Sequence, residues 1–266
     1  MDDDVLRRVS PSRRPVPASR RVAAQPRAVV VAFCLASLLA LAAGLASAQE
    51  RRPYFELSAG FKTGDFGTPT RSDLLYFAPT FGYVALRYDY SVTVPYLSLT
   101  APTAGQSTTQ SGVGDVVARG GRELAAGTSW SLYGALAVKL PTADEARGLG
   151  TGETDLGAFA TLGRDFGSTR LSLLAGTIKT GDPPGQALSD LRLYGIGLAG
   201  WAGATRLYGS IEGRTATVPG AHNPLEVNVG AVHRLSARYW LKSAAFTGLN
   251  DGGPRYGASL GFVYWF

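Results

Sequence analysis

Apolar and polar residues alternate with a period of two through most of residues 54–266. Successive side chains of a β-strand point to opposite faces, so this alternation gives each strand one apolar and one polar face. The longest example runs from Val84 to Ser98, where Val, Leu and Tyr share one face. After residue 48 no run of 18 consecutive apolar residues occurs, so we expect no membrane helix there. The pattern therefore predicts an all-β fold.

Twelve strands account best for the alternation, although three segments alternate poorly and 10 or 14 strands also fit. Most have close to the roughly 9–11 residues that a tilted membrane strand needs. The connections after the odd-numbered strands are mostly long, and those after the even-numbered strands are mostly short. The expected strands are 54–62, 71–80, 84–99, 113–122, 129–140, 154–164, 169–179, 190–200, 204–214, 225–234, 238–247 and 256–266.

Long loops that alternate with short turns are typical of outer-membrane barrels. Closure into a barrel also satisfies the backbone N–H and C=O groups that lipid cannot bind. A soluble β-sandwich would show the same alternation, but it would not explain the alternating loop lengths. The sequence thus predicts a closed antiparallel transmembrane β-barrel.

The last expected strand, 256–266, ends on an aromatic residue. Phe262, Tyr264 and Phe266 share one face of it, while small residues occupy the other face. This strand has to pair with the first strand, 54–62, if the barrel is to close. Its pattern also resembles the C-terminal signal that the outer-membrane assembly machinery reads. We therefore expect these aromatic residues to serve both barrel closure and assembly.

We expect residues 1–48 to form an N-terminal extension and a secretory signal peptide, and residues 49–266 to form the barrel. Arginines precede an apolar run, 28–45, and an Ala-Ser-Ala cleavage motif follows it. An uncleaved membrane anchor is the alternative, but the cleavage motif and the polar residues after it favour removal of the segment. The expected cleavage site consists of Ala46, Ala48 and Gln49.

Export combined with a barrel pattern predicts the outer membrane of a Gram-negative bacterium. An even number of strands leaves both termini on one side of the membrane, which we expect to be the periplasmic side. Cys34, the only cysteine, lies inside the apolar run of the signal peptide. Cleavage would leave no cysteine for a disulfide or a thiolate metal site.

The formal net charge of +6 gives a misleading picture of the mature chain. Seven of the 26 basic and three of the 20 acidic residues lie before residue 28. The remainder is 26 − 7 = 19 basic and 20 − 3 = 17 acidic residues, a net charge of +2. We therefore expect no nucleic-acid partner.

Charged residues within the expected strands fall on the face opposite the apolar residues, so we expect them to line the lumen. Eight bases and six acids share this face, and a pore selective for one ion sign would show a ring of one sign. The alternative is that these residues pair across strands and fill the interior. They are Glu56, Lys62, Arg87, Asp89, Asp115, Arg119, Lys139, Asp155, Arg192, Arg206, Glu212, Arg214, Glu226 and Lys242.

The mature chain offers little for catalysis. Its two histidines, His222 and His233, lack the nearby Ser or acidic partners of known catalytic motifs. Residues 195–200 match G-x-G-x-x-G, but no helix pattern follows, so we read them as strand glycines. Acids around residues 144–155 match no standard calcium loop. We expect no catalytic, cofactor-binding or metal-binding residues, and no enzyme activity.

Several phrases resemble one family of outer-membrane barrels, described as transporter-like or as similar to proteins of the meta-pathway of phenol degradation. They are Thr93-Val94-Pro95-Tyr96, Gly112-Val113-Gly114-Asp115, Lys139-Leu140-Pro141-Thr142, the run 148–155 and Gly181-Asp182-Pro183-Pro184. The resemblance covers most of residues 54–266, and the run 139–155 carries it most strongly. It implies a barrel that passes small, hydrophobic or aromatic compounds.

The combined expectation is a monomeric channel or transporter for passive passage of small molecules. The first alternative is a non-conducting barrel that acts through its extracellular loops, and the second is an outer-membrane hydrolase. The expected partners are outer-membrane lipid and lipopolysaccharide, the barrel assembly machinery and a small-molecule solute. Twelve strands lie between filled barrels of about eight strands and open porins of about 16, so we expect a narrow or plugged lumen.

Overall fold

The computed structural model describes residues 52–66, 70–103 and 106–266. The expected signal peptide lies outside these ranges, together with its cleavage residues Ala46, Ala48 and Gln49. Within the described ranges, no helix is long and apolar enough to cross a membrane. One short 3₁₀ helix, η1 (Glu145–Arg147), accompanies the strands.

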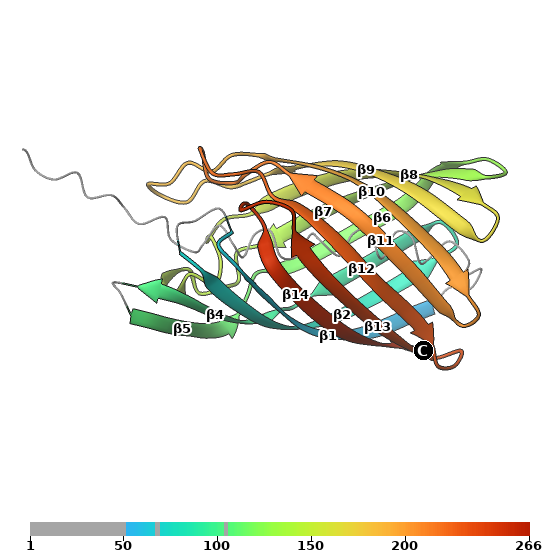
Figure 1. Ribbon diagram of the computed structural model, residues 1–266, viewed down its shortest axis with the longest axis horizontal. Helices are drawn as coiled ribbons and strands as arrows, with labels where there is room; N and C mark the ends of the chain where they lie inside the picture. Colours follow the sequence, from blue (N-terminus) through green and yellow to red (C-terminus); the bar gives the residue numbers. More distant parts are fainter. Residues whose placement is uncertain (1–51, 67–69, 104–105) are drawn as a thin grey trace, which may run out of the picture.

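The strands follow one another as antiparallel neighbours for almost the whole chain (Figure 1). They are β1 (Arg52–Gly64), β2 (Ser72–Ala85), β3 (Tyr88–Thr93), β4 (Tyr96–Thr103), β5 (Gln106–Val113), β6 (Val116–Ala126), β7 (Trp130–Leu140), β8 (Asp155–Phe166), β9 (Thr169–Lys179), β10 (Leu191–Ala202), β11 (Thr205–Arg214), β12 (Leu225–Arg234), β13 (Tyr239–Gly248) and β14 (Pro254–Trp265).

Twelve strand positions close into one ring, which confirms the predicted all-β barrel. Two of these positions are interrupted: β3 and β4 both pair with β2, and β5 and β6 continue each other opposite them. Pro95, which has no N–H to donate to a ladder, separates β3 from β4. Gly114 N donates to Pro95 O at 2.7 Å, so the two interruptions lie side by side.

β14 closes the barrel by pairing with β1, as closure of the predicted barrel required. Phe262 lies opposite Leu57, and Tyr264 lies opposite Phe55. The N–H of Phe266 donates to the backbone oxygen of Pro53 at 3.2 Å. The chain therefore contributes its first and last strands to one continuous ladder.

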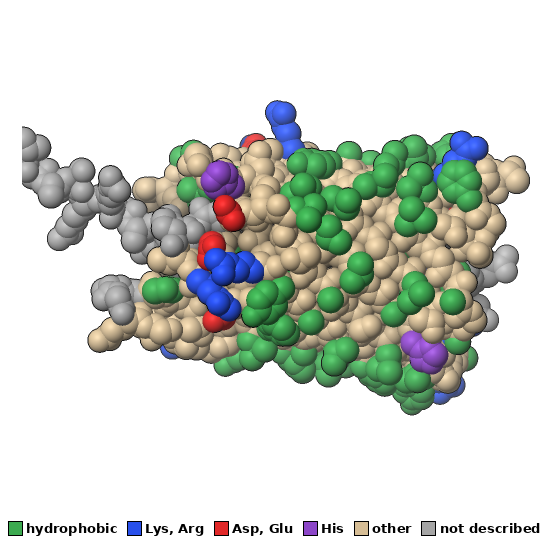
Figure 2. Space-filling view, in the orientation of Figure 1, with side chains coloured by type: hydrophobic (Ala, Val, Ile, Leu, Met, Phe, Trp, Pro, Cys, Tyr) green, Lys and Arg blue, Asp and Glu red, His purple; other side chains and the backbone are tan. Residues whose placement is uncertain are grey.

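The outer wall of the ring is apolar, whereas the inner wall carries the polar side chains together with buried apolar clusters. Phe81, Leu136 and Leu260 are 61%, 68% and 71% exposed, and they belong to the outward face of their strands. Polar side chains such as Glu56 and Thr161 are buried on the inward face. Figure 2 shows hydrophobic side chains across the middle of the wall, while the charged ones gather toward its ends.

The turn between the second and third strands lies later than the alternation indicated. β2 continues through Ala85, and the turn consists of Leu86 and Arg87, so residues 84–98 do not form one strand. Val84 is buried on the inner wall, whereas Tyr88 on β3 faces outward. Alternation could not mark this turn because the period of two continues through it and no Gly or Pro stands there.

Residues 100–112, expected to be a loop, are mostly β-strand. β4 and β5 pair from Tyr96–Val113 to Thr103–Gln106 and form a hairpin that projects beyond the ring (Figure 1). Hydroxyl groups link its strands: Ser111 donates to Ser98 at 2.9 Å. Its Ser, Thr and Gln residues lack the apolar face that the alternation test requires, so the sequence reading missed it.

The two ends of the barrel differ in their connections. β1 begins and β14 ends at one end, which we call the terminal end (marked C in Figure 1). The links there have two to four residues. At the opposite end, apart from the β4–β5 hairpin, the links have five to fourteen residues. This asymmetry matches the predicted alternation of long and short connections.

Candidate channel lumen

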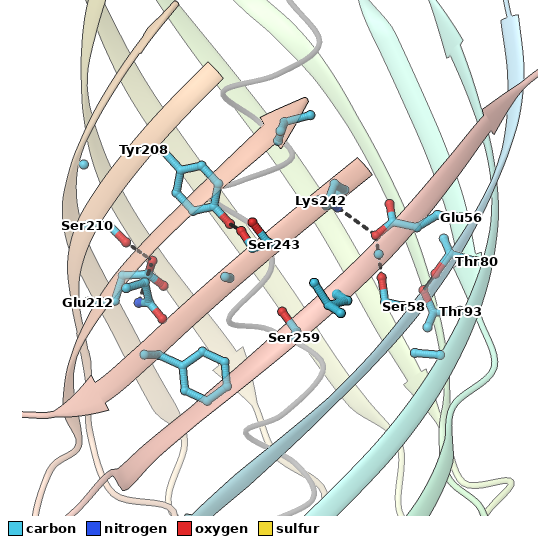
Figure 3. A pocket seen from close by; sticks show the side chains of 18 of the residues that line it. Glu56, Ser58, Thr80, Thr93, Tyr208, Ser210, Glu212, Lys242, Ser243 and Ser259 are labelled. Atoms are coloured by element: carbon cyan, nitrogen blue, oxygen red, sulfur yellow. Dashed lines mark hydrogen bonds and ion pairs between the residues drawn. The ribbon is translucent and has the colours of Figure 1, made fainter. Parts of the chain in front are cut away.

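A cavity of mixed polar and apolar lining lies inside the ring, and most strands of the ring contribute residues to it. Figure 3 shows Glu56, Ser58, Thr80, Tyr208 and Glu212 pointing into it. These side chains come from β1, β2 and β11, and further hydroxyl groups come from β13 and β14. The interior therefore offers hydrogen-bonding groups to a solute instead of a uniformly apolar core.

Glu56 and Lys242 form an ion pair across the inner face of β14 (Figure 3). Lys242 Nζ lies 2.7 Å from Glu56 Oε1, and Ser58 Oγ donates to the same oxygen at 2.7 Å. These residues come from β1 and β13, which flank β14. Gly261 stands between Ser58 and Lys242 in the register and has no side chain to separate them. The small inner face of β14 thus permits an ion pair between strands that are not neighbours.

A second glycine of β14 serves the same purpose nearer the opposite end. Gly257 lies between Lys62 on β1 and Phe246 on β13. Lys62 Nζ sits 4.5 Å from the centre of the Phe246 ring and 3.7 Å from Glu226 Oε2 on β12. A Cβ on Gly257 would lie 2.0 Å from the Phe246 ring, so the contact depends on the glycine.

The neighbouring strand β11 places three charged residues on the inner wall. Glu212 accepts hydrogen bonds from Ser210 at 2.6 Å and from Asn228 at 3.3 Å. Arg206 is only 6% exposed and lines the cavity. Among the described residues, neither Arg206 nor Arg214 has a carboxylate within ion-pair distance. The guanidinium group of Arg206 is therefore available to a negatively charged solute in the cavity.

A third cluster joins β3, β6 and β7. The carboxylate of Asp89 accepts from both the guanidinium of Arg119 and the hydroxyl of Tyr133. Arg119 also donates to the Tyr133 hydroxyl at 2.7 Å. Gly121 leaves the space that this ring occupies, because a Cβ there would lie 1.7 Å from the Tyr133 hydroxyl. These side chains stabilise the inner wall near the terminal end.

At the opposite end, Lys139 holds the loop 141–154 against the inner wall. Lys139 Nζ lies 3.0 Å from Asp115 Oδ2, 3.2 Å from Asp155 Oδ2 and 2.8 Å from Thr151 Oγ1. Backbone N–H groups complete the cluster, one donating to each Asp. The motif that carries the family resemblance, 139–155, therefore anchors this loop.

Leu149, at the tip of the loop, packs into the barrel. Its side chain is fully buried in a cluster with Leu74, Tyr76, Leu97 and Leu99, which lie on the inner faces of β2 and β4. The loop thus covers the inner wall beside the interruption between β5 and β6. In sequence, Lys139, Asp115 and Asp155 stood out as alternating inward charges and as members of the phrases that carry the family resemblance. That the three side chains meet became visible only in the folded barrel, once the loop was placed.

Twelve of the fourteen charged residues expected in the lumen have their side chains on the inner face, and Arg87 and Arg192 do not. Arg87 stands in the β2–β3 turn, where its side chain is 71% exposed and 3.9 Å from Glu123. Arg192 lies on the outward face of β10 with the exposed Tyr194 and Ile196. Because the glycines of β10 obscure its alternation, the sequence-based prediction assigned Arg192 to the wrong face of this strand.

The two histidines lie at opposite ends of the barrel and cannot share one site. His222 is exposed in the loop 215–224, and His233 is exposed on the outward face of β12. His233 Nδ1 lies 2.8 Å from Thr205 Oγ1. Among the described residues, no group of three or more His, Cys, Asp and Glu side chains could hold a metal ion.

Sequence reasoning overlooked the aromatic residues of the inner wall. Tyr54, Trp240 and Trp265 face inward at the terminal end and contact one another. They lie on the same strand faces as Glu56, Lys242 and other polar residues, so the alternation alone could have identified them as inward-facing. Aromatic residues near the ends of membrane strands usually form an outward-facing girdle at the membrane interface, so an inward position was not expected for them.

Comparison with solved structures shows the barrel fold. A COG4313 outer membrane channel from Pseudomonas putida F1 aligns with a TM-score of 0.71 and 14% identity, over 84% of this chain and 98% of that one. The translocator domain of the autotransporter NalP from Neisseria meningitidis aligns with a TM-score of 0.60 and 14% identity, over 92% and 100%. The NanC porin aligns with a TM-score of 0.52 and 7% identity, over 79% and 98%.

No family model matches the sequence, and no curated protein matches it either. At identities of 14% or less, these structural similarities establish the architecture and leave the activity to be argued from the lumen itself.

Proposed function

We propose that this protein is an integral outer-membrane β-barrel that lets small molecules pass passively through its lumen. The observation that carries the proposal is a cavity with charged and hydroxyl groups in its lining, inside a closed ring whose outer wall is apolar. An apolar outer wall suits lipid, in which only a closed barrel satisfies every strand's backbone groups. The COG4313 protein with this fold, which is an outer membrane channel, supports the same location.

The connections support an orientation with both termini in the periplasm. Short turns at the terminal end and long loops at the opposite end follow the arrangement of bacterial outer-membrane barrels. On this proposal the loop 141–154 and the β4–β5 hairpin are extracellular. Outer-membrane lipid and lipopolysaccharide surround a monomer, which the barrel assembly machinery inserts through its C-terminal strand.

The solute is small because twelve strands enclose a narrow interior that ion pairs and the loop 141–154 restrict further. The resemblance to barrels similar to proteins of the meta-pathway of phenol degradation favours hydrophobic or aromatic compounds. Hydroxyl groups from Thr80, Tyr208 and Ser259 supply polar contacts along the way.

A non-conducting barrel that acts through its loops is the second candidate. The burial of Leu149 and the pairing of Lys139, Lys62 and Lys242 favour it, because these contacts fill interior space. An outer-membrane hydrolase has less support, since His222 and His233 lie at opposite ends. If the wild type hydrolysed lipid or peptide, and if replacing either histidine abolished this hydrolysis, the protein would be an enzyme instead.

Single-channel recording in planar bilayers tests the proposal. We expect the wild type to conduct, and shortening the loop 141–154 to raise the conductance because Leu149 then leaves the inner wall. Shortening the loop 215–224, which contributes no group to the Lys139 cluster, serves as the matched control for a cut at the same end of the barrel. A folded barrel that never conducts, with or without the loop 141–154, would refute the channel and favour the second candidate.

A further inference from the structure

An arc of inward-facing aromatic side chains follows adjacent strands at the terminal end. Tyr54 on β1 and Trp265 on β14 have ring centres 5.1 Å apart, and Trp265 and Trp240 on β13 have centres 5.3 Å apart. Arg234 on β12 lies over the Trp240 ring at 5.8 Å and over the Trp201 ring on β10 at 5.6 Å. We call these five residues, together with Arg206 on β11, the aromatic arc.

The position of these tryptophans is unusual for a membrane barrel. Trp residues normally form outward girdles at the two membrane interfaces, as Trp130 does here with 43% exposure. The other three tryptophans share the inner face with cavity-lining residues instead: Trp201 is paired with Arg206, and Trp240 lies two residues from Lys242. Lipid contact therefore does not explain them.

Two cations belong to the arc and lack acidic partners. Neither Arg206 nor Arg234 has a carboxylate within ion-pair distance among the described residues. Arg206 pairs in register with Val232, two residues before Arg234. Such diagonal neighbours lie about 7–8 Å apart, so both guanidinium groups can reach one anion. The lumen charges nearer the middle and at the opposite end are mostly paired, which sets these two apart.

Unsatisfied donors point to a ligand with an acceptor group. The indole N–H groups of Trp240 and Trp265 are buried, and each lacks a hydrogen-bond partner. Trp265 as a whole is only 5% exposed. A buried donor without a partner costs about 1–3 kcal/mol, which an acceptor atom on a bound molecule would recover.

We propose that the aromatic arc is a binding site for small planar aromatic anions, such as aromatic carboxylates, at the terminal mouth of the lumen. The flat ring would stack on the indole faces, as aromatic pairs do at centre separations of roughly 4.5–7 Å. The carboxylate would accept hydrogen bonds from Arg206 and Arg234, whose planar guanidinium groups match its two oxygens. A plain anion would leave the aromatic faces unused, and a neutral ring would leave both cations unpaired.

This inference rests on the proposed channel function for its biological meaning, but its test does not need conduction. The purified full-length barrel in detergent is titrated calorimetrically at constant ionic strength with benzoate, acetate and benzyl alcohol. We expect benzoate to bind at least about tenfold more tightly than either of the others, since each lacks one half of the recognition. Equal binding of acetate would indicate an anion site alone, and equal binding of benzyl alcohol an apolar site alone; either result overturns the proposal.

Variants locate the site. Arg234→Gln and Trp240→Leu should each weaken benzoate binding by about tenfold, while Arg164→Gln and Trp130→Leu, on the outward face, should leave it unchanged. Trp240→Phe keeps a ring and should lose less than Trp240→Leu, which guards against a folding defect. Benzoate binding unaffected by both arc variants would refute the site.

Conductance separates this inference from the channel itself. A barrel that binds benzoate through the arc but never conducts would refute the proposed function alone. A barrel that conducts but does not prefer benzoate would refute the aromatic arc alone.

Discussion

Replacing Lys139 by Met should release the loop 141–154 from the inner wall. The ammonium group of Lys139 contacts Asp115 and Asp155, whose side chains are 2% and 4% exposed, and both acids would lose their cation. Removing one partner of a buried ion pair costs about 3–5 kcal/mol. We expect the lower end of this range, because each carboxylate keeps a backbone N–H donor, from Ala143 and from Gly181.

A loss of about 3 kcal/mol raises the open fraction of the loop roughly a hundredfold. Hydrogen exchange of the amides of residues 143–153, followed by mass spectrometry in detergent, would report this fraction directly. Single-channel recording should show a larger or noisier conductance as Leu149 leaves its cluster. Lys179→Met, at an exposed strand end, is the matched control and should change neither readout.

Adding Asp115→Asn and Asp155→Asn to Lys139→Met provides the sharper test. The triple variant removes all three charges but keeps the acceptor oxygens, so no buried charge is left unpaired. We expect it to restore most of the protection of the loop. If Lys139→Met exchanges at the wild-type rate, or if the triple variant is no better than the single one, the ionic anchor does not hold the loop.

Arg214→Glu should shift the reversal potential in a salt gradient toward cation preference, since it replaces an inward cation on β11 by an anion; an unchanged potential would place Arg214 outside the solute path. Gly261→Leu should overpack the inner wall at a cost of about 1–3 kcal/mol, because a Cβ there lies 3.1 Å from Ser58 Oγ and 3.3 Å from Lys242 Cβ. We expect the folded barrel to lose its characteristic mobility on a gel at a lower temperature than the wild type does. Gly197→Leu, where an added Cβ meets nothing closer than 3.4 Å, should cost less. Deleting Phe266 should reduce the amount of barrel assembled in membranes without altering the conductance of the barrels that do form; normal assembly would contradict its role as a signal.

The architecture of this protein could be predicted from its amino-acid sequence alone. Alternation has a period of two only in strands, and closure is the one arrangement that leaves no strand edge in lipid. Together with the spacing of the turns they favoured twelve strand positions, although 10 or 14 also fitted, and closure then required the last strand to pair with the first. The sequence also identified most of the inward charges, because placing Arg or Lys against lipid is costly.

Which of these charges meet became apparent only in the folded barrel. Lys242 reaches Glu56 across β14 because Gly261 stands between them, and Lys139 gathers two acids because the following loop folds back. The periodicity predicts which face of its strand a side chain occupies, but it does not predict the register between strands that are distant in sequence. The assignment of side chains to the inward or outward face was also wrong where glycines break the alternation, as at Arg192.

The aromatic arc shows the same division most clearly. Its residues are scattered over 212 positions, from Tyr54 to Trp265, and each one alone is an ordinary strand residue. The ring brings β10 to β14 and β1 side by side, and the register of these strands sets their inward aromatic residues at one height. Sequence supplies the side chains and their faces, whereas strand order and stagger, fixed by backbone hydrogen bonds between distant segments, assemble them into one surface.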